Sequence, residues 1–486
     1  MRDGTGGGAD GRPTVVILGG GPAGLMAAWK LRLAPSPPQV MVIEALAQPG
    51  GLCLTVERDG YRFDLGGHRF ISRHAELVAR VKALMGDTLL VRERTSRILL
   101  GGRSYQYPLS ASNLMKTLPA GLAARGIADY GRQALARRRS PTPVRTFEEW
   151  VTSRFGATLF ELFFKPYTEK LWGLPTSELS ADWAAQRISL MNLADVGKRL
   201  VRAGSGQPRT YAREYYYPRL GIGQLFEVLV QELERLGVWF VPSAWVTGLE
   251  MDGDRAVAVR YGWDDAATSV RCDQVISTLP LGTLAQAIQP ADRRVDIAAK
   301  SLYHRGLRFL NVMLDGPPLL DATWAYVSEP RYVMTRIQEP TQRSPFMAPP
   351  GKTGVMLEVP CDPGDPLWEM DDDALFARCA TDLAELGYPI AHRATGWFST
   401  RAANAYPVYT LNYRAHRQRL LDTVDGAENI WTCGRQGLFR YLFMDTAMEM
   451  GWRAAEEVLA GVRPSSARMM ELDQHNGLLE IEATTA

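Results

Sequence analysis

The sequence has few cysteines and no long hydrophobic run, and each shortage excludes a class of protein. Its five cysteines are far apart and form no C-x-x-C pair, so neither a zinc site nor a disulfide framework is expected. No stretch approaches the roughly 18 consecutive apolar residues of a membrane span. The opening MRDGTGGGADGRP lacks the apolar segment of a secretion signal and is typical of a flexible leader. We therefore expect a soluble, cytoplasmic protein with reduced thiols.

The sequence also has almost no excess of positive or negative charge. The 55 Lys and Arg residues nearly balance the 53 Asp and Glu residues, so the overall charge gives no reason to expect nucleic acid or an acidic membrane as a partner. The histidines show no H-x-x-x-H or H-x-x-E-H spacing, which argues against a metal site. What is present is an ordinary globular composition, with 46% hydrophobic residues over 486 positions. That length is enough for about two or three hydrophobic cores.

A strand, a glycine-rich turn and a helix are predicted near the start of the chain. Residues 14–18 (TVVIL) form an apolar run typical of a strand buried on both faces of a parallel sheet. They lead directly into Gly19, Gly21 and Gly24, spaced as G-x-G-x-x-G, and a helical pattern follows over residues 25–33. A second buried strand at residues 40–43 ends at Glu44.

This order of elements predicts a dinucleotide site. The first glycine permits a tight turn, the second lets a pyrophosphate approach the backbone, and the third packs the helix on the strand. Glu44, twenty residues beyond Gly24, can accept hydrogen bonds from a ribose diol. Strand, helix and acid in the required order make the glycine pattern much more specific than it would be alone.

Two further glycine pairs favour FAD over NAD. Gly50 and Gly51 follow Glu44 closely, and Gly66 and Gly67 precede His68. Paired glycines near the first crossover indicate a backbone packed against an extended, flat ligand.

With these segments the chain resembles the flavoprotein family that includes amine oxidases, protoporphyrinogen oxidases and UDP-galactopyranose mutases. The resemblance implies that Glu44 binds the adenosine ribose. It also implies that the Gly66-Gly67-His68 stretch lies beside the isoalloxazine, where His68 would contact or tune the flavin.

Later motifs are similar to the mutase branch of that family. KPYTEKLWG, at residues 165–173, resembles the mutase segment G-Y-T-x-K-Q-W-G, whose tyrosine and tryptophan line the nucleotide pocket. The final segment, with Gly434-Arg435, Phe439-Arg440-Tyr441 and Met444-Asp445, is similar to the mutase's G-R…Y-K-Y-Y-D-M-D. There the arginine and tyrosine hold the diphosphate, and the following helix points its N-terminus at the flavin. Residues 107–109, 305–309 and 405–408 also fall in the mutase order.

These observations and the resemblance together assign a role to each candidate residue. The catalytic candidates are His68 and Arg308, and the substrate-binding candidates are Tyr167, Trp172, Tyr406, Arg435 and Tyr441. The cofactor-binding candidates are Gly19, Gly21, Pro22, Ala23, Gly24, Glu44, Ala45, Gly50, Gly51, Leu52, Gly66, Gly67, His68, Val246, Gly434, Arg435, Met444, Asp445 and Thr446.

Two departures from the mutase pattern leave the reaction open. The mutase segment R-I-P-V-R, whose last arginine grips the diphosphate, ends here in Met191, and an acid of Y-Y-D-M is replaced by Phe443. Residues 180–187 (SADWAAQR) are shared with an uncharacterised protoporphyrinogen-oxidase-like branch, which does not fix a reaction.

Three functions are therefore compatible with the sequence. The first is a redox-neutral pyranose/furanose mutase, which would act on a nucleotide sugar through N5 of reduced FAD and would need an electron donor. The second is an FAD-dependent oxidase or dehydrogenase, because fold does not decide chemistry. The third, a non-catalytic FAD carrier, has no positive feature in the sequence.

The expected fold is α/β, with a discontinuous Rossmann-type FAD-binding domain, a helical insertion and an antiparallel sheet on the substrate side. We expect a leader at 1–12, an FAD-binding domain from 13–104, 219–296 and 400–462, a helical substrate domain at 105–218, a sheet substrate domain at 297–399, and a tail at 463–486. The sequence leaves the sugar, the nucleotide and the oligomeric state open.

Overall fold

The computed structural model describes residues 12–72, 74–106, 118–139, 144–187, 214–263, 266–290 and 292–476. Most of the leader, the motif at 107–109 and the departure at Met191 lie outside the described residues.

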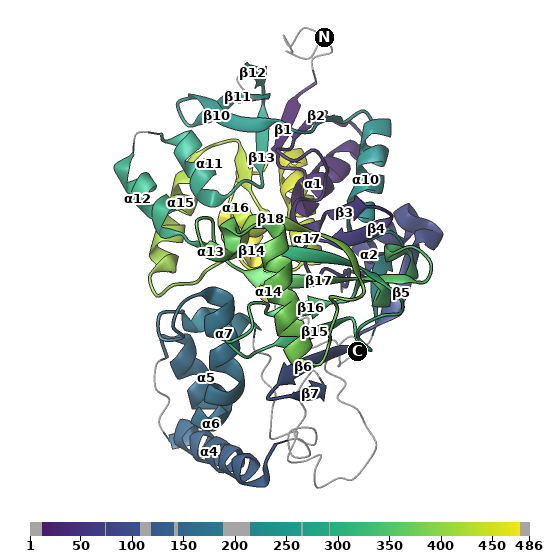
Figure 1. The fold of residues 1–486 in the computed structure, drawn as a ribbon. Helices are drawn as coiled ribbons and strands as arrows, with labels where there is room; N and C mark the ends of the chain where they lie inside the picture. Colours follow the sequence, from purple (N-terminus) through teal and green to yellow (C-terminus); the bar gives the residue numbers. More distant parts are fainter. Residues whose placement is uncertain are drawn as a thin grey trace.

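A five-stranded parallel sheet forms the upper part of the molecule (Figure 1). Its strand order is β19 (Ile430–Thr432), β13 (Gln274–Ser277), β1 (Thr14–Leu18), β2 (Gln39–Ile43) and β9 (Trp239–Val241). In this register Val16 pairs with Val275 on one side and with Met41 on the other. Strands from the beginning, middle and end of the chain thus share one sheet, which confirms the predicted discontinuous Rossmann-type domain.

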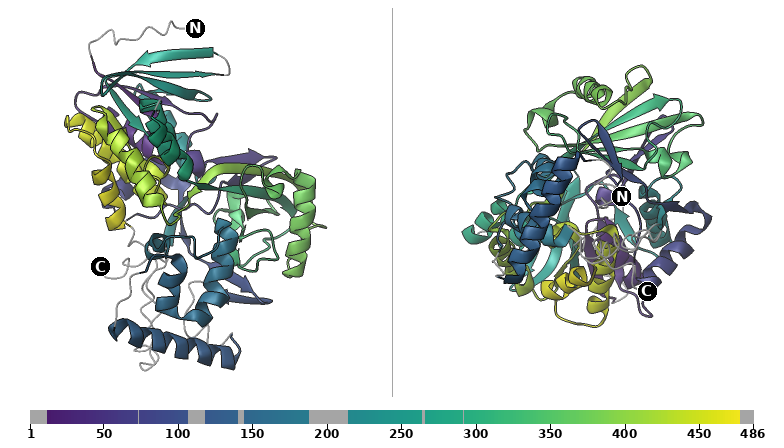
Figure 2. Two further views of the ribbon diagram at one scale, coloured as in Figure 1. Left: turned by 90° about the vertical axis from the view of Figure 1, so that its left-hand side faces the viewer. Right: turned by 90° about the horizontal axis from the view of Figure 1, so that it is seen from below.

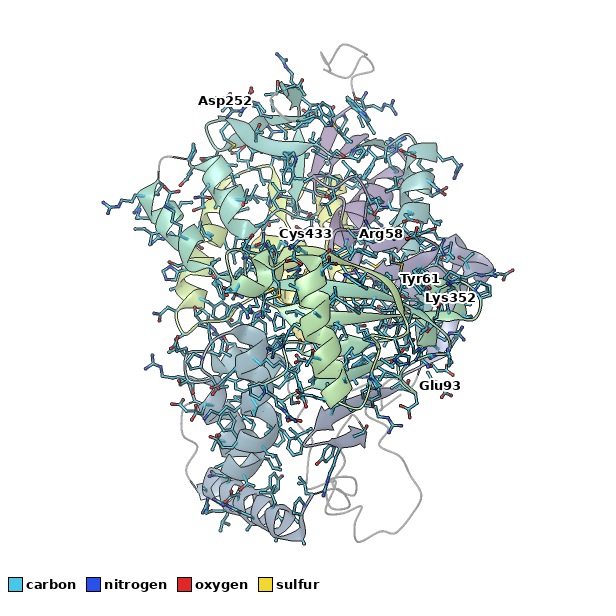
Figure 3. The ribbon with its side chains drawn as sticks, viewed as in Figure 1. Arg58, Tyr61, Glu93, Asp252, Lys352 and Cys433 are labelled. Atoms are coloured by element: carbon cyan, nitrogen blue, oxygen red, sulfur yellow. The ribbon has the colours of Figure 1, made fainter. Side chains whose placement is uncertain are left out.

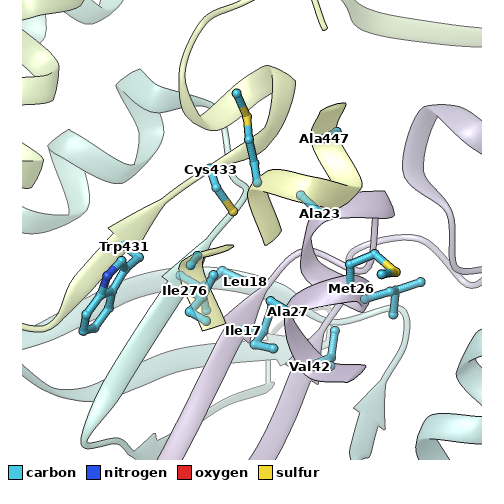
Figure 4. Packing of buried hydrophobic residues seen from close by; sticks show 14 of the residues in the cluster. Ile17, Leu18, Ala23, Met26, Ala27, Val42, Ile276, Trp431, Cys433 and Ala447 are labelled. Carbon is cyan, nitrogen blue, oxygen red and sulfur yellow. The ribbon is translucent and has the colours of Figure 1, made fainter. Parts of the chain in front are cut away.

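Helices cover this sheet and bury its apolar strands. The helix α1 (Pro22–Arg32) packs against α10 (Gly223–Arg235) and α17 (Met444–Leu459). Figure 4 shows Ile17, Leu18, Val42 and Ile276 of the sheet beside side chains of α1 and α17. A Cβ on Gly451 would lie 1.8 Å from the carbonyl oxygen of Ala23. Glycine therefore lets the middle of α17 touch the backbone at the start of α1, which brings distant parts of the sequence together.

A second, seven-stranded sheet lies below and beside the first (Figure 2). Its order is β18 (Ala394–Pro407), β14 (His304–Asp315), β17 (Lys352–Pro360), β16 (Arg336–Gln338), β15 (Trp324–Val327), β6 (Ser96–Leu100) and β7 (Arg103–Gln106). Every neighbouring pair is antiparallel except β15 with β6. Strand β6, the first half of β7 and most of β18 come from ranges that the sequence analysis gives to the FAD-binding domain. Our domain proposal places these strands with the substrate-side sheet.

Helices form the lowest part of the molecule in Figure 1 and in the left view of Figure 2. They are α4 (Ala120–Arg139), α5 (Phe147–Phe155), α6 (Ala157–Leu159), the π-turn Phe160–Phe164, α7 (Lys165–Trp172) and α8 (Ala181–Arg187). Thr146 and Glu149 form a capping box at the start of α5, and α7 ends at Gly173, whose φ is 67°. The last part of the predicted helical range is instead β8 (Glu214–Pro218), which pairs with β5 (Leu89–Glu93).

Shorter elements complete the fold. The three-stranded sheet at the top of Figure 1 contains β10 (Trp245–Asp252), β11 (Arg255–Trp263) and β12 (Ala266–Arg271). The remaining elements are the hairpin β3 (Thr55–Arg58) and β4 (Tyr61–Asp64), and the helices α2 (Ala75–Met85), α11 (Leu281–Ile288), α12 (Arg293–Ser301), α13 (Pro366–Glu369), α14 (Asp372–Glu385), α15 (Tyr413–Gly426), α16 (Gly434–Gly437) and α18 (Ser466–Asn476). No helix in the described ranges is long and apolar enough to cross a bilayer.

Candidate active site

The three glycines of the first loop have different surroundings. A Cβ on Gly19, whose φ is +105°, would lie 2.2 Å from Oγ1 of Thr278, and a Cβ on Gly24 would lie 1.9 Å from the carbonyl oxygen of Gly19. A Cβ on Gly21, by contrast, would meet nothing within 4 Å. Gly19 and Gly24 are therefore needed for packing, while Gly21 leaves open space at the N-terminus of α1, where a phosphate is stabilised by free N–H groups and the helix dipole.

Glu44 lies beside this open space. It is buried, and its two carboxylate oxygens accept the N–H groups of Gly20, at 2.6 Å, and Leu46, at 2.8 Å. Burial raises the pKa of Glu44, and these backbone hydrogen bonds oppose the rise. A carboxylate fixed in this way can accept a further hydroxyl group of a ribose.

The other predicted glycines converge on the same loop. The N–H of Gly50 donates to the carbonyl oxygen of Gly20 at 2.9 Å, and a Cβ on Gly51 would lie 3.5 Å from Cα of Gly21. Ala45 follows Glu44, and half-buried Val246 lies on β10, just after Ala244, whose N–H donates to the carbonyl oxygen of Glu44 at 2.9 Å. These glycine-lined surfaces form an open cradle suited to an extended dinucleotide.

The C-terminal segment closes the other side of the cradle. Gly434, with φ +80°, would place a Cβ 3.1 Å from that of Ala23. The preceding residue, Cys433, is completely buried in the middle of the molecule (Figure 3). Helix α17 then begins with buried Met444, Asp445 and Thr446.

Asp445 is a buried carboxyl group with an unused acceptor. Its Oδ2 atom has no hydrogen-bond partner. Burial, and to a lesser degree the charge of Glu449, raises its pKa to about 7. Such an orphaned polar atom needs a partner from a ligand or solvent, so its position supports a polar, flat cofactor at the start of α17.

A cavity of about 390 Å³ lies between the start of α17, the seven-stranded sheet and the helical region. All predicted catalytic and substrate-binding residues except Arg308 line this cavity. The predicted residues in its wall are Leu52, Gly66, Gly67, His68, Tyr167, Trp172, Tyr406, Arg435, Tyr441, Met444 and Asp445. Residues from widely separated stretches of the chain are thus brought to one site.

Four side chains form an aromatic box in the wall: Trp172, Trp183, Tyr406 and Tyr441. The rings of Tyr406 and Tyr441 are stacked, with centroids 5.2 Å apart and an interplanar angle of 22°. Trp183 meets Trp172 edge-on at 4.6 Å and Tyr441 at 5.2 Å. The indole N–H of Trp172 is buried without an acceptor. The aromatic box therefore places aromatic groups and one unused donor in the cavity wall, a combination that suits a planar ligand carrying an acceptor.

Arg435 is fixed next to the aromatic box. Its guanidinium donates to the carbonyl oxygens of Ala405, at 3.1 Å, and Leu442, at 2.6 Å. It lies 4.7 Å from the centroid of the Tyr441 ring. The charge is thus held at a defined point of the cavity wall.

Arg308 does not belong to this site, which corrects its predicted catalytic role. Its guanidinium is fully buried and donates to Ser399, to Asp372 and to the carbonyl oxygens of Leu367 and Met370. The physical reason is strand alternation: Leu307 and Phe309 on β14 line the cavity, so the residue between them points to the opposite face of the sheet.

His68 faces the cavity as a neutral ring. Burial, followed by the charges of Arg435 and Arg343, lowers the pKa of His68 to about 3. Its Nδ1 atom has no hydrogen-bond partner. At physiological pH the imidazole can therefore donate or accept a hydrogen bond but adds no positive charge.

Several cavity residues have no counterpart among the sequence predictions. The chief ones are Arg69, Arg94, Arg336, Trp324 and Tyr326. Arg69 and Arg94 lie 5.3 Å and 5.7 Å from the ring centroid of Trp324, and Arg336 forms an ion pair with buried Glu358 at 3.1 Å. Arg69 adjoins the glycine pair and could have been suspected on that ground. The sequence around Arg94 and Arg336 contains no motif that would indicate a place in the site.

The fold and the cradle define an FAD-binding flavoenzyme, and comparison with known proteins specifies its family. The chain belongs to the family of flavin containing amine oxidoreductases, whose model matches residues 22–459. Membership of this flavin-containing family identifies the chain as an FAD-dependent enzyme.

Similar curated proteins include oxidases of porphyrinogens. Protoporphyrinogen oxidase from Oryza sativa subsp. japonica is 24% identical over 65% of this chain and 59% of its own length. Coproporphyrinogen III oxidase from Bacillus subtilis is 25% identical over 47% of this chain and 52% of that enzyme. The chain therefore matches only about half to three-fifths of the length of these two relatives.

Solved structures show the same fold. A reduced UDP-galactopyranose mutase is 22% identical, with a TM-score of 0.81 over 95% of this chain and 99% of that one. A putrescine oxidase bound to putrescine is 17% identical, with a TM-score of 0.61 over 92% and 99% of the two chains. At these identities the similarity establishes the fold only. The reaction has to be inferred from the residues of the site.

Proposed function

We propose that this protein is a redox-neutral pyranose/furanose mutase that acts on a nucleotide sugar. The observation that carries the proposal is the aromatic box, which adjoins Arg435 in the same cavity as His68 and Asp445. Aromatic faces suit a nucleotide base, and fixed guanidinium groups suit a diphosphate. Reduced FAD would supply a nucleophilic nitrogen for the anomeric carbon.

Each part of the wall has a role in this proposal. Tyr167 and Trp172 would contact the base, and the buried N–H of Trp172 would donate to one of its oxygen atoms. Arg435 and Tyr441 would hold the diphosphate and stabilise its charge as it departs. Tyr406, stacked on Tyr441, would keep that phenol in place.

Other arginines in the cavity can supply the positive charge that was expected from Arg308. Arg69, Arg94 and Arg336 all line the wall. Although Glu358 neutralises part of the charge of Arg336, the cavity carries more guanidinium than carboxylate groups. An anionic substrate is therefore favoured. The electron donor that reduces the flavin is part of the same proposal.

A second candidate function is net oxidation by the flavin. The observation that favours it is the apolar end of the cavity, lined by Ile98, Phe163 and Phe164. A flat apolar substrate with acidic substituents would use these side chains together with the arginines. The porphyrinogen oxidases among the relatives agree with this alternative.

Anaerobic incubation with a panel of nucleotide sugars separates the two functions. The dithionite-reduced holoenzyme and an oxidised control are each incubated with the panel, and isomers are separated by chromatography. We expect a new isomer only with reduced enzyme. If no sugar isomerises, while a candidate reductant bleaches the oxidised flavin and oxygen restores it, the oxidoreductase function replaces the mutase.

A further inference from the structure

The first turns of α17 separate the cavity from a groove on the protein surface. The groove has a volume of about 320 Å³ and lies between α2, α17 and α18. Asp445 lines the cavity and Glu449 lines the groove. Because they are four residues apart on one helix, they are neighbours on the same face, with Cβ atoms about 5–6 Å apart. A pair of carboxyl groups thus spans the wall between solvent and the cavity.

The inner group, Asp445, is suited to exchange a proton near neutral pH. Its side chain is only 3% exposed, and Oδ2 has no partner. Burial and the charge of Glu449 raise its pKa to about 7, while backbone hydrogen bonds from Thr446 and Asp445, and to a lesser degree Arg69, oppose the rise. A group that titrates near the working pH can both accept and release a proton.

The outer group, Glu449, is held at the groove. Its carboxylate accepts the hydroxyl of Ser72 at 3.4 Å, and Ser72 in turn accepts the N–H of His74 at 3.1 Å. The other charged or titratable side chains that line the groove are His74 just before α2, Glu76 and Arg80 on α2, Arg453 and Glu456 on α17, and Arg468 and Glu471 on α18. This mixture of charges keeps the groove polar and open to water.

We propose that Glu449 and Asp445 form a proton relay between the surface groove and the flavin cavity. A proton from an acid in the groove binds the carboxylate of Glu449, moves to the carboxylate of Asp445, and then leaves Asp445 for an acceptor in the cavity. Each carboxyl group returns to its ionised form, and no electron moves along the path. The relay serves either reaction considered above, because each transfers protons to or from groups in the flavin cavity.

The bound flavin provides the reporter for the test. Because Asp445 lines the cavity, its change of charge should shift the visible spectrum of the oxidised holoenzyme, with a midpoint near pH 7. Asp445→Asn should abolish this titration, and Glu449→Gln should lower its midpoint, since a neighbouring negative charge is removed. A wild-type spectrum that does not change between pH 5 and 9, or a titration that persists in Asp445→Asn, would overturn the assignment of Asp445.

The rate of the same spectral change after a stopped-flow pH jump tests the path. We expect Glu449→Gln to slow it at least about tenfold and added acetate, at constant pH, to restore the rate by carrying protons past the missing carboxyl group. Glu76→Gln, which removes another carboxylate from the same groove, should behave as wild type.

Two results would contradict the relay. One is a wild-type rate in Glu449→Gln, and the other is a slow rate that acetate leaves unchanged, which would indicate a structural effect only. If Glu449→Gln fails to retain FAD, Glu449→Asp keeps an acid but shortens its reach, and an unchanged rate in that variant would also overturn the proposal. None of these outcomes depends on sugar isomerisation, so failure of the mutase assay is distinguishable.

Discussion

The guanidinium of Arg308 donates to the carboxylate of Asp372 at 2.6 Å, on the face of β14 opposite the cavity. This pair, together with Ser399 and the backbone acceptors, joins the seven-stranded sheet to the start of α14. This arrangement gives Arg308 a structural function. Arg435, by contrast, is fixed in the cavity wall.

Arg308→Ala should therefore destabilise the protein. Removal of the guanidinium leaves buried acceptors without a donor, and we expect a loss of about 2–4 kcal/mol in the free energy of unfolding. The lower part of that range applies if water reaches Asp372, whose side chain is 37% exposed. Urea unfolding measures the change. A variant as stable as wild type but deficient in substrate binding would restore Arg308 to the site.

Arg435→Ala tests the charge in the cavity wall. We expect weaker binding of a nucleoside diphosphate by about tenfold or more, the effect of losing one charge-assisted hydrogen bond of about 1.5–3 kcal/mol. Calorimetric titration of the oxidised holoenzyme provides the affinity. Arg401→Ala is the matched control, because Arg401 is exposed and lies outside the cavity wall. Equal affinities for Arg435→Ala and Arg401→Ala would contradict the proposed role.

The dinucleotide loop could be predicted from sequence, whereas the cavity wall could be predicted only in part. The functions of Gly19, Gly21 and Gly24 follow from local backbone geometry, so their spacing is sufficient. Arg308 shows the limit, because a motif places it on a strand but does not tell which face of the sheet it occupies. Arg336 lies far from every predicted motif, and only the pairing of β16 with β15 and β17 brings it to the site.

Gly21→Ala should weaken FAD binding, whereas Gly24→Ala should reduce the stability of the fold. A Cβ on Gly21 enters open space, so the fold should tolerate it while FAD binding weakens, because the methyl group occupies the approach of the pyrophosphate. A Cβ on Gly24 would collide with the backbone at Gly19, so that variant should unfold more readily. Thermal unfolding of flavin-free protein and FAD titration distinguish the two effects. Undiminished FAD affinity in Gly21→Ala would contradict the phosphate position.

Glu44→Ala should loosen FAD. The carboxylate is already oriented by Gly20 and Leu46, so its loss removes a prepared acceptor for the ribose and costs about 1–3 kcal/mol of binding free energy. Equilibrium dialysis followed by the flavin absorbance measures the change. Full flavin occupancy after extensive dialysis would show that the ribose is held elsewhere.

Asp445→Asn should stabilise the flavin-free protein at high pH but not at low pH. Burial raises the pKa of Asp445 from 3.8 to about 7 on folding. Between about pH 4 and pH 7 the folded protein therefore binds a proton that the unfolded chain has released, so wild-type stability falls as the pH rises through this window. Below this window both states are protonated, so the free-energy cost of burying an ionised carboxylate is absent, whereas above it the full cost applies.

Asparagine cannot ionise and has no such cost. The stability difference between the variant and wild type should therefore grow to at most about 4 kcal/mol by pH 8, at about 1.4 kcal/mol per pH unit. Urea unfolding at pH 4, 6 and 8, with the exposed Asp87→Asn as the background control, measures this difference. A difference independent of pH would show that folding does not shift the pKa of Asp445.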